Sequence, residues 1–163
     1  FSCWVYFDSV GFANGQTYRQ IMEVDGISPT GSVIQDGLSL YLNGNSILFK
    51  TTDSTGASSY ASCSVAGKPV GWHHILCTWN VNMSAVFVDG EQGSTVIANP
   101  KLQDKLEEKI GIGNDSAAVS SLLNSLIDDV CIYRRALSPE EIRAIYHSQR
   151  PLYDPNRIDH IIG

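Results

Sequence analysis

The chain has 163 residues, of which 43% are hydrophobic and 17% are charged, and its net charge is −6 at neutral pH. This length and composition fit one globular domain. Basic residues do not cluster beyond the pair Arg134-Arg135, which argues against a nucleic-acid partner, and no apolar run approaches the ~20 residues that span a bilayer, which argues against membrane insertion.

Short strands dominate the pattern along the chain. Residues 1–7 alternate in two sets with the period of a strand, which are Phe1, Cys3, Val5 and Phe7 on one side and Ser2, Trp4 and Tyr6 on the other. Because this pattern is already under way at residue 1, we expect the chain to be a segment of a longer protein with a truncated first strand. Asn43-Gly44-Asn45 between apolar runs predicts a hairpin. The remaining predicted strands are 21–24, 38–42, 47–49, 60–65, 72–79, 85–88, 109–112 and 126–133.

One helix is predicted, at residues 138–147. Ser138-Pro139-Glu140-Glu141 supplies an N-cap, a proline in the first turn and a capping-box glutamate. Leu137 and Ile142 occupy the positions of a hydrophobic staple. The domain is expected to span residues 1–148, followed by an extended tail or linker, 149–163, that docks on a neighbouring domain or subunit.

The four cysteines are Cys3, Cys63, Cys77 and Cys131. No two of them form a CxxC pair, so a zinc site is not indicated. Their even number leaves two disulfides open as an alternative. Each cysteine falls in a strand-like stretch, where a small apolar residue serves equally well, so we favour free thiols.

Three stretches resemble the laminin-G-like, concanavalin-A-like lectin/glucanase superfamily. They are Gly71-Trp72-His73-His74-Ile75 with Thr78-Trp79-Asn80, then Val86-Phe87-Val88-Asp89-Gly90, and finally residues 126–138. Their order and spacing are similar to those of the family over roughly residues 1–148. The resemblance implies an all-β fold, a two-sheet antiparallel jelly-roll sandwich with one short C-terminal helix, and the strands predicted above agree with it.

The hypothesis that the chain is a glucanase depends on Glu23 and Asp25. Retaining glucanases of the superfamily carry Glu-x-Asp-x-x-Glu on one strand, which supplies the two carboxylates of glycoside hydrolysis. Here Ser28 takes the place of the third acid, and Gly26 interrupts the strand. A strand ending in an Asp-Gly turn explains the pattern better, so we predict no catalytic residue and no enzyme.

His73 and His74 invite a metal or general-base interpretation. Adjacent residues of a strand point to opposite faces, so the two imidazoles cannot easily share one ligand sphere. We therefore expect both to be packing residues of the sheet, beside Trp72 and Trp79.

Asp128 and Asp129 are the candidate metal ligands. Alternation puts them on opposite faces, so one of them should lie inward, where a carboxylate needs a partner. Laminin-G-like domains often bind Ca²⁺, which takes several oxygen ligands, so the resemblance implies a structural calcium ion here. The alternative is a carboxylate that accepts backbone N–H groups of a loop. Candidate co-ligands are Asp25, Asp53 and Asp115.

The resemblance implies a non-catalytic carbohydrate- or glycoprotein-binding and display module of a larger extracellular, cell-surface or virion-surface protein. Its partner would be a glycan or a protein surface. One alternative is a structural decoration or fibre domain of a phage or virus particle, and a remote one is a glycoside hydrolase or lyase. These functions rest on analogy at the level of the fold.

Overall fold

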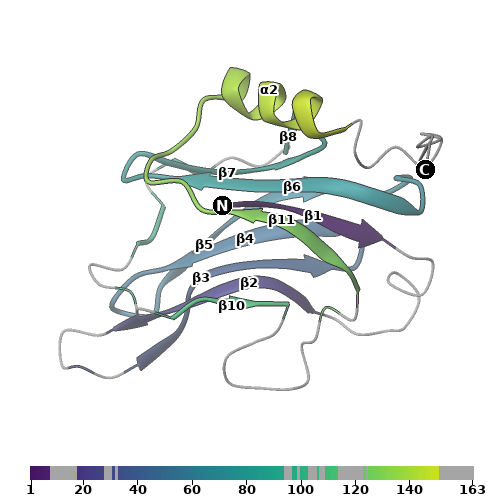
Figure 1. Ribbon diagram of the computed structural model, residues 1–163. Helices are drawn as coiled ribbons and strands as arrows, with labels where there is room; N and C mark the ends of the chain where they lie inside the picture. The colour runs from purple at the N-terminus through teal and green to yellow at the C-terminus, as the bar shows by residue number, and fades with distance from the viewer. Residues whose placement is uncertain are drawn as a thin grey trace, which may run out of the picture.

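The computed structural model describes residues 1–7, 18–27, 31, 33–93, 97, 98, 100–102, 106, 109–113, 123 and 125–150. Two antiparallel sheets pack face to face, and a single described helix lies on the outside of one of them (Figure 1). Most of the predicted tail 149–163 falls outside the described residues. The predicted all-β sandwich with one short C-terminal helix is therefore confirmed.

The six-stranded sheet has the order β11-β1-β6-β7-β8, with β9 also paired to β7. Asp89 and Gly90, both at positive φ, form the two-residue turn that joins β7 to β8. Such turns match the right-handed twist of the strands they connect. The bounds of the strands are Ser2–Phe7 (β1), Gly71–Trp79 (β6), Met83–Val88 (β7), Glu91–Gln92 (β8), Ile97–Ala98 (β9) and Ile127–Cys131 (β11).

The five-stranded sheet has the order β10-β2-β3-β4-β5. The hairpin predicted at Asn43-Gly44-Asn45 joins β3 to β4, where Asn43 pairs with Ser46 and Gly44 has a φ of 54°. The bounds of the strands are Arg19–Ile27 (β2), Val33–Asn43 (β3), Ser46–Thr52 (β4), Ser58–Ser64 (β5) and Gly111–Ile112 (β10).

The main core lies between the two sheets. Alternate residues of β1 point into it, among them Cys3 and Val5, which pair with Ile75 and His73 of β6. Phe49 and Leu40 of the opposite sheet are fully buried against them. All four cysteines are free thiols, and three of them are buried as small apolar side chains.

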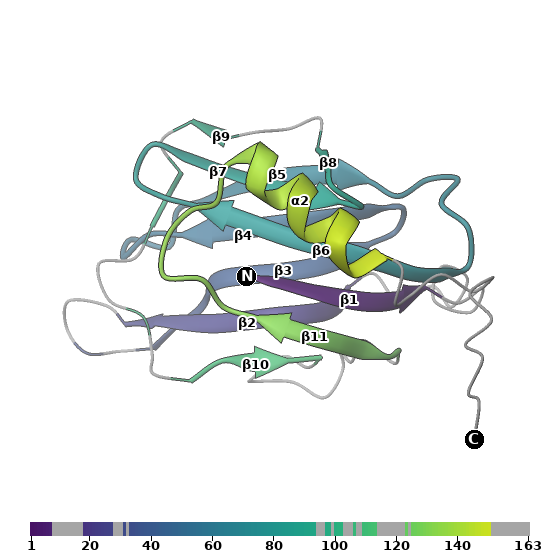
Figure 2. The same ribbon diagram turned by 45° about the horizontal axis from the view of Figure 1, so that its top comes forward.

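Helix α2 (Pro139–Gln149) covers the outer face of the six-stranded sheet (Figure 2). The predicted capping box is present, with Ser138 and Glu141 satisfying each other's backbone N–H groups. The staple residues Leu137 and Ile142 are buried in a second apolar cluster with Phe87 of β7. Trp4 of β1 donates from Nε1 to Gln149 Oε1 at 3.0 Å, so the far end of the helix is tied to the sheet as well.

The structure corrects several predicted boundaries. The last two predicted strands, 109–112 and 126–133, shorten to Gly111–Ile112 and Ile127–Cys131. Strands β8 and β9 were not predicted, because two residues are too few to show a period. The helix runs to Gln149 instead of 147, which carries it one residue past the predicted domain end at 148.

Candidate functional site

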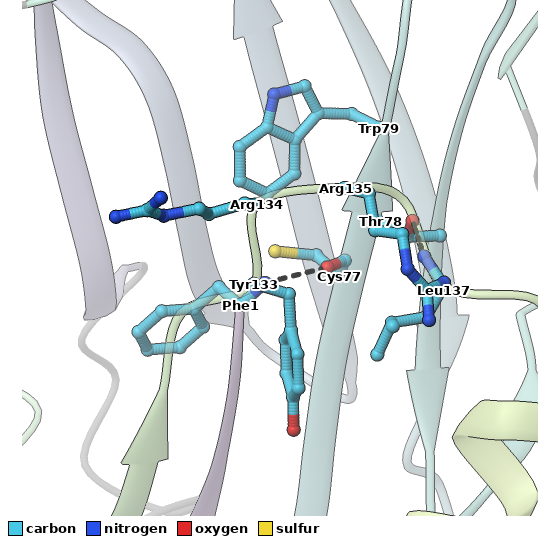
Figure 3. A pocket seen from close by; sticks show the side chains of 8 residues that line it. All are labelled: Phe1, Cys77, Thr78, Trp79, Tyr133, Arg134, Arg135 and Leu137. Carbon is cyan, nitrogen blue, oxygen red and sulfur yellow. Dashed lines mark hydrogen bonds between the residues drawn. The ribbon is translucent and has the colours of Figure 1, made fainter.

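Two adjoining cavities open at one end of the sandwich, and Phe1 and Trp79 line both of them. The first, which we name the arginine cavity, has a volume of about 180 Å³ and is shown in Figure 3. The second, which we name the apolar cavity, has a volume of about 260 Å³ and lies between the ends of the two sheets. Among the described residues that line them, neither cavity contains an acid or a histidine.

Three segments that are far apart in sequence build the arginine cavity. They are Phe1, the end of β6 at residues 77–79, and the connection from β11 to α2 at residues 133–137. The backbone N–H of Phe1 donates to the carbonyl of Cys77 at 3.1 Å, and the N–H of Leu137 donates to Thr78 Oγ1 at 3.3 Å (Figure 3). These bonds fix the connection against the strand end, so the cavity is held by backbone contacts.

The side chains of the arginine cavity combine flat rings with a cation. Trp79 is partly exposed, with its ring centroid 5.3 Å from that of Phe49, and Tyr133 is partly exposed with its hydroxyl 3.4 Å from Ser2 Oγ. Arg135 is held by Glu141 through two bonds of 2.7 and 2.6 Å. Arg134 is exposed and has no partner among the described residues, and in Figure 3 it extends on the same side as the Phe1 ring.

This arrangement can bind a small anionic group. A free guanidinium matches the geometry of a carboxylate, with two parallel N–H···O bonds. Indole and phenol rings present apolar faces with a polar edge. Arg134, Trp79 and Tyr133 are therefore suited to a ligand that carries a carboxylate next to a flat, partly apolar ring.

Asp128 and Asp129 do not lie where the alternation placed them. Both carboxylates are exposed, so the expectation that one of them faces inward is wrong. Asp129 adopts a φ of 47°, and the register with β1 shifts there, which is a β-bulge. Ile127 lies before the bulge and packs on the core. Because the inserted residue reverses the faces of the residues that follow it, Ile132 lines the apolar cavity.

The calcium interpretation of Asp128 and Asp129 gains no support from this geometry. Asp128 Oδ1 accepts the backbone N–H of the next residue, Asp129, at 2.8 Å, whereas the alternative predicted N–H groups of a neighbouring loop. No group of three or more metal-ligating side chains occurs within the described residues, whereas Ca²⁺ takes 6–8 oxygens. Of the candidate co-ligands, Asp53 holds its own loop, and Asp115 lies outside the described residues.

Glu23 and Asp25 are buried on β2, not displayed in a cleft. Glu23 is 2% exposed, lies opposite Ser39 of β3 and has an interacting partner. Neither acid lines the two cavities, and Ser28 is outside the described residues.

His73 and His74 point to opposite faces, as predicted, and the structure shows what each contacts. His73 stacks on Phe7 in the core, at a centroid distance of 4.7 Å, and its Nδ1 lies 2.9 Å from Asp89 Oδ2. His74 is buried on the other face between the rings of Trp4 and Tyr146, and neither of its ring nitrogens has a hydrogen-bond partner. Burial lowers the pKa of His74 to about 4, against the attraction of the Asp89 carboxylate.

Asp89 is hydrogen-bonded to both histidines and to a lysine. Its carboxylate accepts from Lys68 Nζ at 2.7 Å, from His73 Nδ1 at 2.9 Å and from the backbone N–H of His74 at 3.1 Å. Burial raises the pKa of Asp89, but the bonds from His73 and Lys68 outweigh it and hold the pKa below its ordinary value. These contacts stabilise the turn between β7 and β8 and give Asp89 a structural role.

Comparison with known families identifies the fold family. The model of the concanavalin A-like lectin/glucanases superfamily matches residues 1–143. The chain belongs to this superfamily. No curated protein matches this member of the superfamily significantly.

Solved structures share the fold of this superfamily member. The binding domain of botulinum neurotoxin serotype D matches with a TM-score of 0.67 and 19% identity, over 91% of this chain and 36% of that one. The same serotype's ligand binding domain in complex with N-acetylneuraminic acid matches with a TM-score of 0.61 and 18% identity, over 91% and 35%. The binding domain of Paraclostridial Mosquitocidal Protein 1 matches with a TM-score of 0.64 and 16% identity, over 90% and 36%. The chain thus spans little more than a third of these domains.

The sequence did not reveal the arginine cavity or the role of Asp89. Arg134 and Trp79 were noted only as parts of motifs, because their proximity depends on how β6 and the β11–α2 connection meet. The Asp89-Gly90 turn was visible as a strand-closing pair. Its partners Lys68 and His73 lie 21 and 16 residues away, and no local pattern connects them.

Proposed function

We propose that this chain is a non-catalytic binding module that recognises an acidic glycan at the arginine cavity, as part of a larger extracellular, cell-surface or virion-surface protein. The observation that carries the proposal is Arg134, an exposed guanidinium without a described partner in a cavity that Trp79 and Tyr133 also line. The volume of about 180 Å³ is below the roughly 300–1,000 Å³ of pockets for drug-sized ligands, so one sugar ring is the expected occupant.

Relatives with the same fold support an acidic sugar as the first ligand to test. A botulinum neurotoxin serotype D ligand binding domain forms a complex with N-acetylneuraminic acid, a sugar that carries a carboxylate. The matched third of that domain shares the fold of this chain and little of its sequence. The choice of ligand class therefore depends on Arg134 and its aromatic neighbours.

Within the described part of the chain, no acid lines either cavity, and this supports a non-catalytic role. Hydrolysis of a glycoside normally needs two carboxylates at the sugar, one as acid and one as base or nucleophile. The remote glycosidase alternative would have to use Glu23. Retained hydrolysis in Glu23→Gln would remove that residue from consideration, and its loss in a folded variant would revive the alternative.

A panel of neutral and acidic glycans tests the proposal. Wild type should bind glycans that end in a carboxylate-bearing sugar and not their neutral counterparts. Arg134→Ala should lose this binding without losing the fold, because the side chain is exposed. Arg143→Ala is the matched control, since Arg143 is an exposed arginine on α2 that does not line the cavity. Equal binding by Arg134→Ala and wild type would refute the proposed site.

A second candidate is a structural domain of a phage or virus particle, with a protein surface as its partner. Exposed apolar side chains along and beside β11 favour it, because Leu126 and Ile132 are 61% and 63% exposed. A protein shortened after Arg150 tests the predicted docking of the tail. If the shortened protein assembles as the full chain does, the predicted docking of the tail is refuted.

A further inference from the structure

The apolar cavity takes no part in the glycan site proposed above. Met22, Val24 and Leu38 of the five-stranded sheet form its inner wall, and its volume is about 260 Å³. Protein interiors contain few voids larger than a water molecule, whereas an engineered apolar cavity of about 150 Å³ binds benzene. The apolar cavity therefore has room for a hydrocarbon group larger than a benzene ring.

The mouth of the apolar cavity is itself apolar. Ile110 and Ile132 line the cavity, yet 39% and 63% of their surfaces are exposed. Covering large exposed apolar side chains is favourable, and such surfaces mark binding sites for ligands or proteins. A ligand can thus enter from solvent and be contacted by apolar side chains along its whole path.

The charges at this end of the sandwich indicate what kind of ligand enters. Among the described lysines and arginines, Lys109 and Arg134 are the ones with no ion pair, hydrogen bond or ring contact to a described residue. Lys109 lines the apolar cavity and is the one charged residue among its described lining residues. A free ammonium at the edge of an apolar cavity complements a single anionic group attached to a hydrocarbon chain.

We propose that the apolar cavity binds the hydrocarbon chain of a monomeric medium-chain fatty acid, whose carboxylate pairs with Lys109. A free acid fits better than a membrane lipid, because the chain has a net charge of −6 and the adjacent strand β11 exposes Asp128 and Asp129. Anionic bilayers attract clusters of basic residues and repel such a surface. One cavity and one cation thus match one acyl chain and one carboxylate.

Quenching of tryptophan fluorescence tests this proposal on the full chain. Trp79 lines the cavity, whereas Trp4 lies beneath α2 and Trp72 packs on Tyr6. 11-Bromoundecanoate, used below the concentration at which it forms micelles, should quench Trp79 saturably, because bromine quenches tryptophan only at close range. 11-Bromoundecanol has the same chain without the carboxylate and should bind about tenfold more weakly or worse.

Two variants and two controls complete the experiment. Lys109→Gln should weaken binding of the acid about tenfold and leave the alcohol unchanged. Ile132→Asp should abolish quenching, whereas Val70→Asp, a similarly exposed apolar-to-acid change (55% against 63%) just before the start of β6, should have no effect. Arg134→Ala should still bind the acid, so this proposal and the glycan proposal fail separately. No saturable quenching, equal binding of acid and alcohol, or quenching only by vesicles of brominated phosphatidylglycerol would overturn the proposal.

Discussion

Replacing Asp89 by asparagine should destabilise the fold substantially, although the substitution only replaces one carboxylate oxygen by an NH2 group. The carboxylate accepts three hydrogen bonds, from Lys68 Nζ, His73 Nδ1 and the His74 backbone, at 2.7, 2.9 and 3.1 Å. Asparagine tolerates the positive φ of 55° at this position, so backbone strain does not contribute. Its side-chain amide has one acceptor oxygen. The NH2 group takes the place of the other carboxylate oxygen and faces the hydrogen-bond donors that this oxygen had accepted from.

The expected magnitude follows from the bonds that are lost. Hydrogen bonds to charged groups contribute about 1.5–3 kcal/mol each, and the bond to the partly exposed Lys68 falls at the low end or below. Losing two of the three therefore costs roughly 2–4 kcal/mol, or about 4–16 °C in Tm for a domain of this size. Because the folded pKa of Asp89 is lowered, its stabilisation is present above the ordinary pKa of 3.8 and disappears as the pH falls through the folded value.

Thermal melts of Asp89→Asn and wild type, followed by circular dichroism at pH 7 and in acid, measure this effect. Asp53→Asn is the matched control, because Asp53 also accepts three hydrogen bonds but holds an exposed loop. The Asp89 variant should melt well below the Asp53 variant at pH 7, and the gap should narrow in acid. Equal melting temperatures for the two variants would refute the reasoning.

Three further changes have defined outcomes. Ser138→Ala removes the N-cap of α2 and should lower the free energy of unfolding by ~1 kcal/mol. Ser148→Ala, within the same helix, should cost nothing. Equal melting temperatures for the two variants would mean that the helix does not begin after Ser138. His74 has a folded pKa of about 4 against an ordinary 6.5, so wild type should lose stability as the pH falls from 6.5 to 4, by at most ~1.4 kcal/mol per pH unit. His74→Phe should flatten that slope, and an unchanged slope would assign it to another group. Calcium binding by Asp128 or Asp129 is tested by melting wild type with and without a chelator. Because both carboxylates are exposed, we expect the two melting curves to superimpose. A Tm that the chelator lowers, in an effect that either Asp→Asn variant abolishes, would establish the metal site.

Local sequence signals were sufficient for most of the fold. Alternation located the long strands, because one face of each packs on the core and the other does not. The hairpin at Asn43-Gly44 and the cap at Ser138 were predictable because each depends on a few adjacent residues with special backbone requirements. The superfamily resemblance then supplied the two-sheet sandwich architecture.

Long-range and irregular features could not be predicted in the same way. The bulge at Asp129 depends on a positive φ at a residue that is not glycine, and alternation assumes that no such insertion occurs. The arginine cavity is lined by Phe1, by residues near 77 and by residues near 134, which are far apart in the sequence. It therefore forms only when β1, β6 and the β11–α2 connection have packed together. The apolar cavity likewise needs both sheets.

The central claim is that the arginine cavity binds an acidic sugar, and a titration followed by ¹H–¹⁵N NMR tests it most directly. With N-acetylneuraminic acid as the probe, saturable shifts should be confined to the backbone amides around Thr78 and residues 133–137, and Arg134→Ala should abolish them. N-Acetylmannosamine, which lacks the carboxylate, should produce no such shifts. Saturable shifts at another face of the sandwich, or shifts at the cavity that persist in Arg134→Ala, would contradict the account.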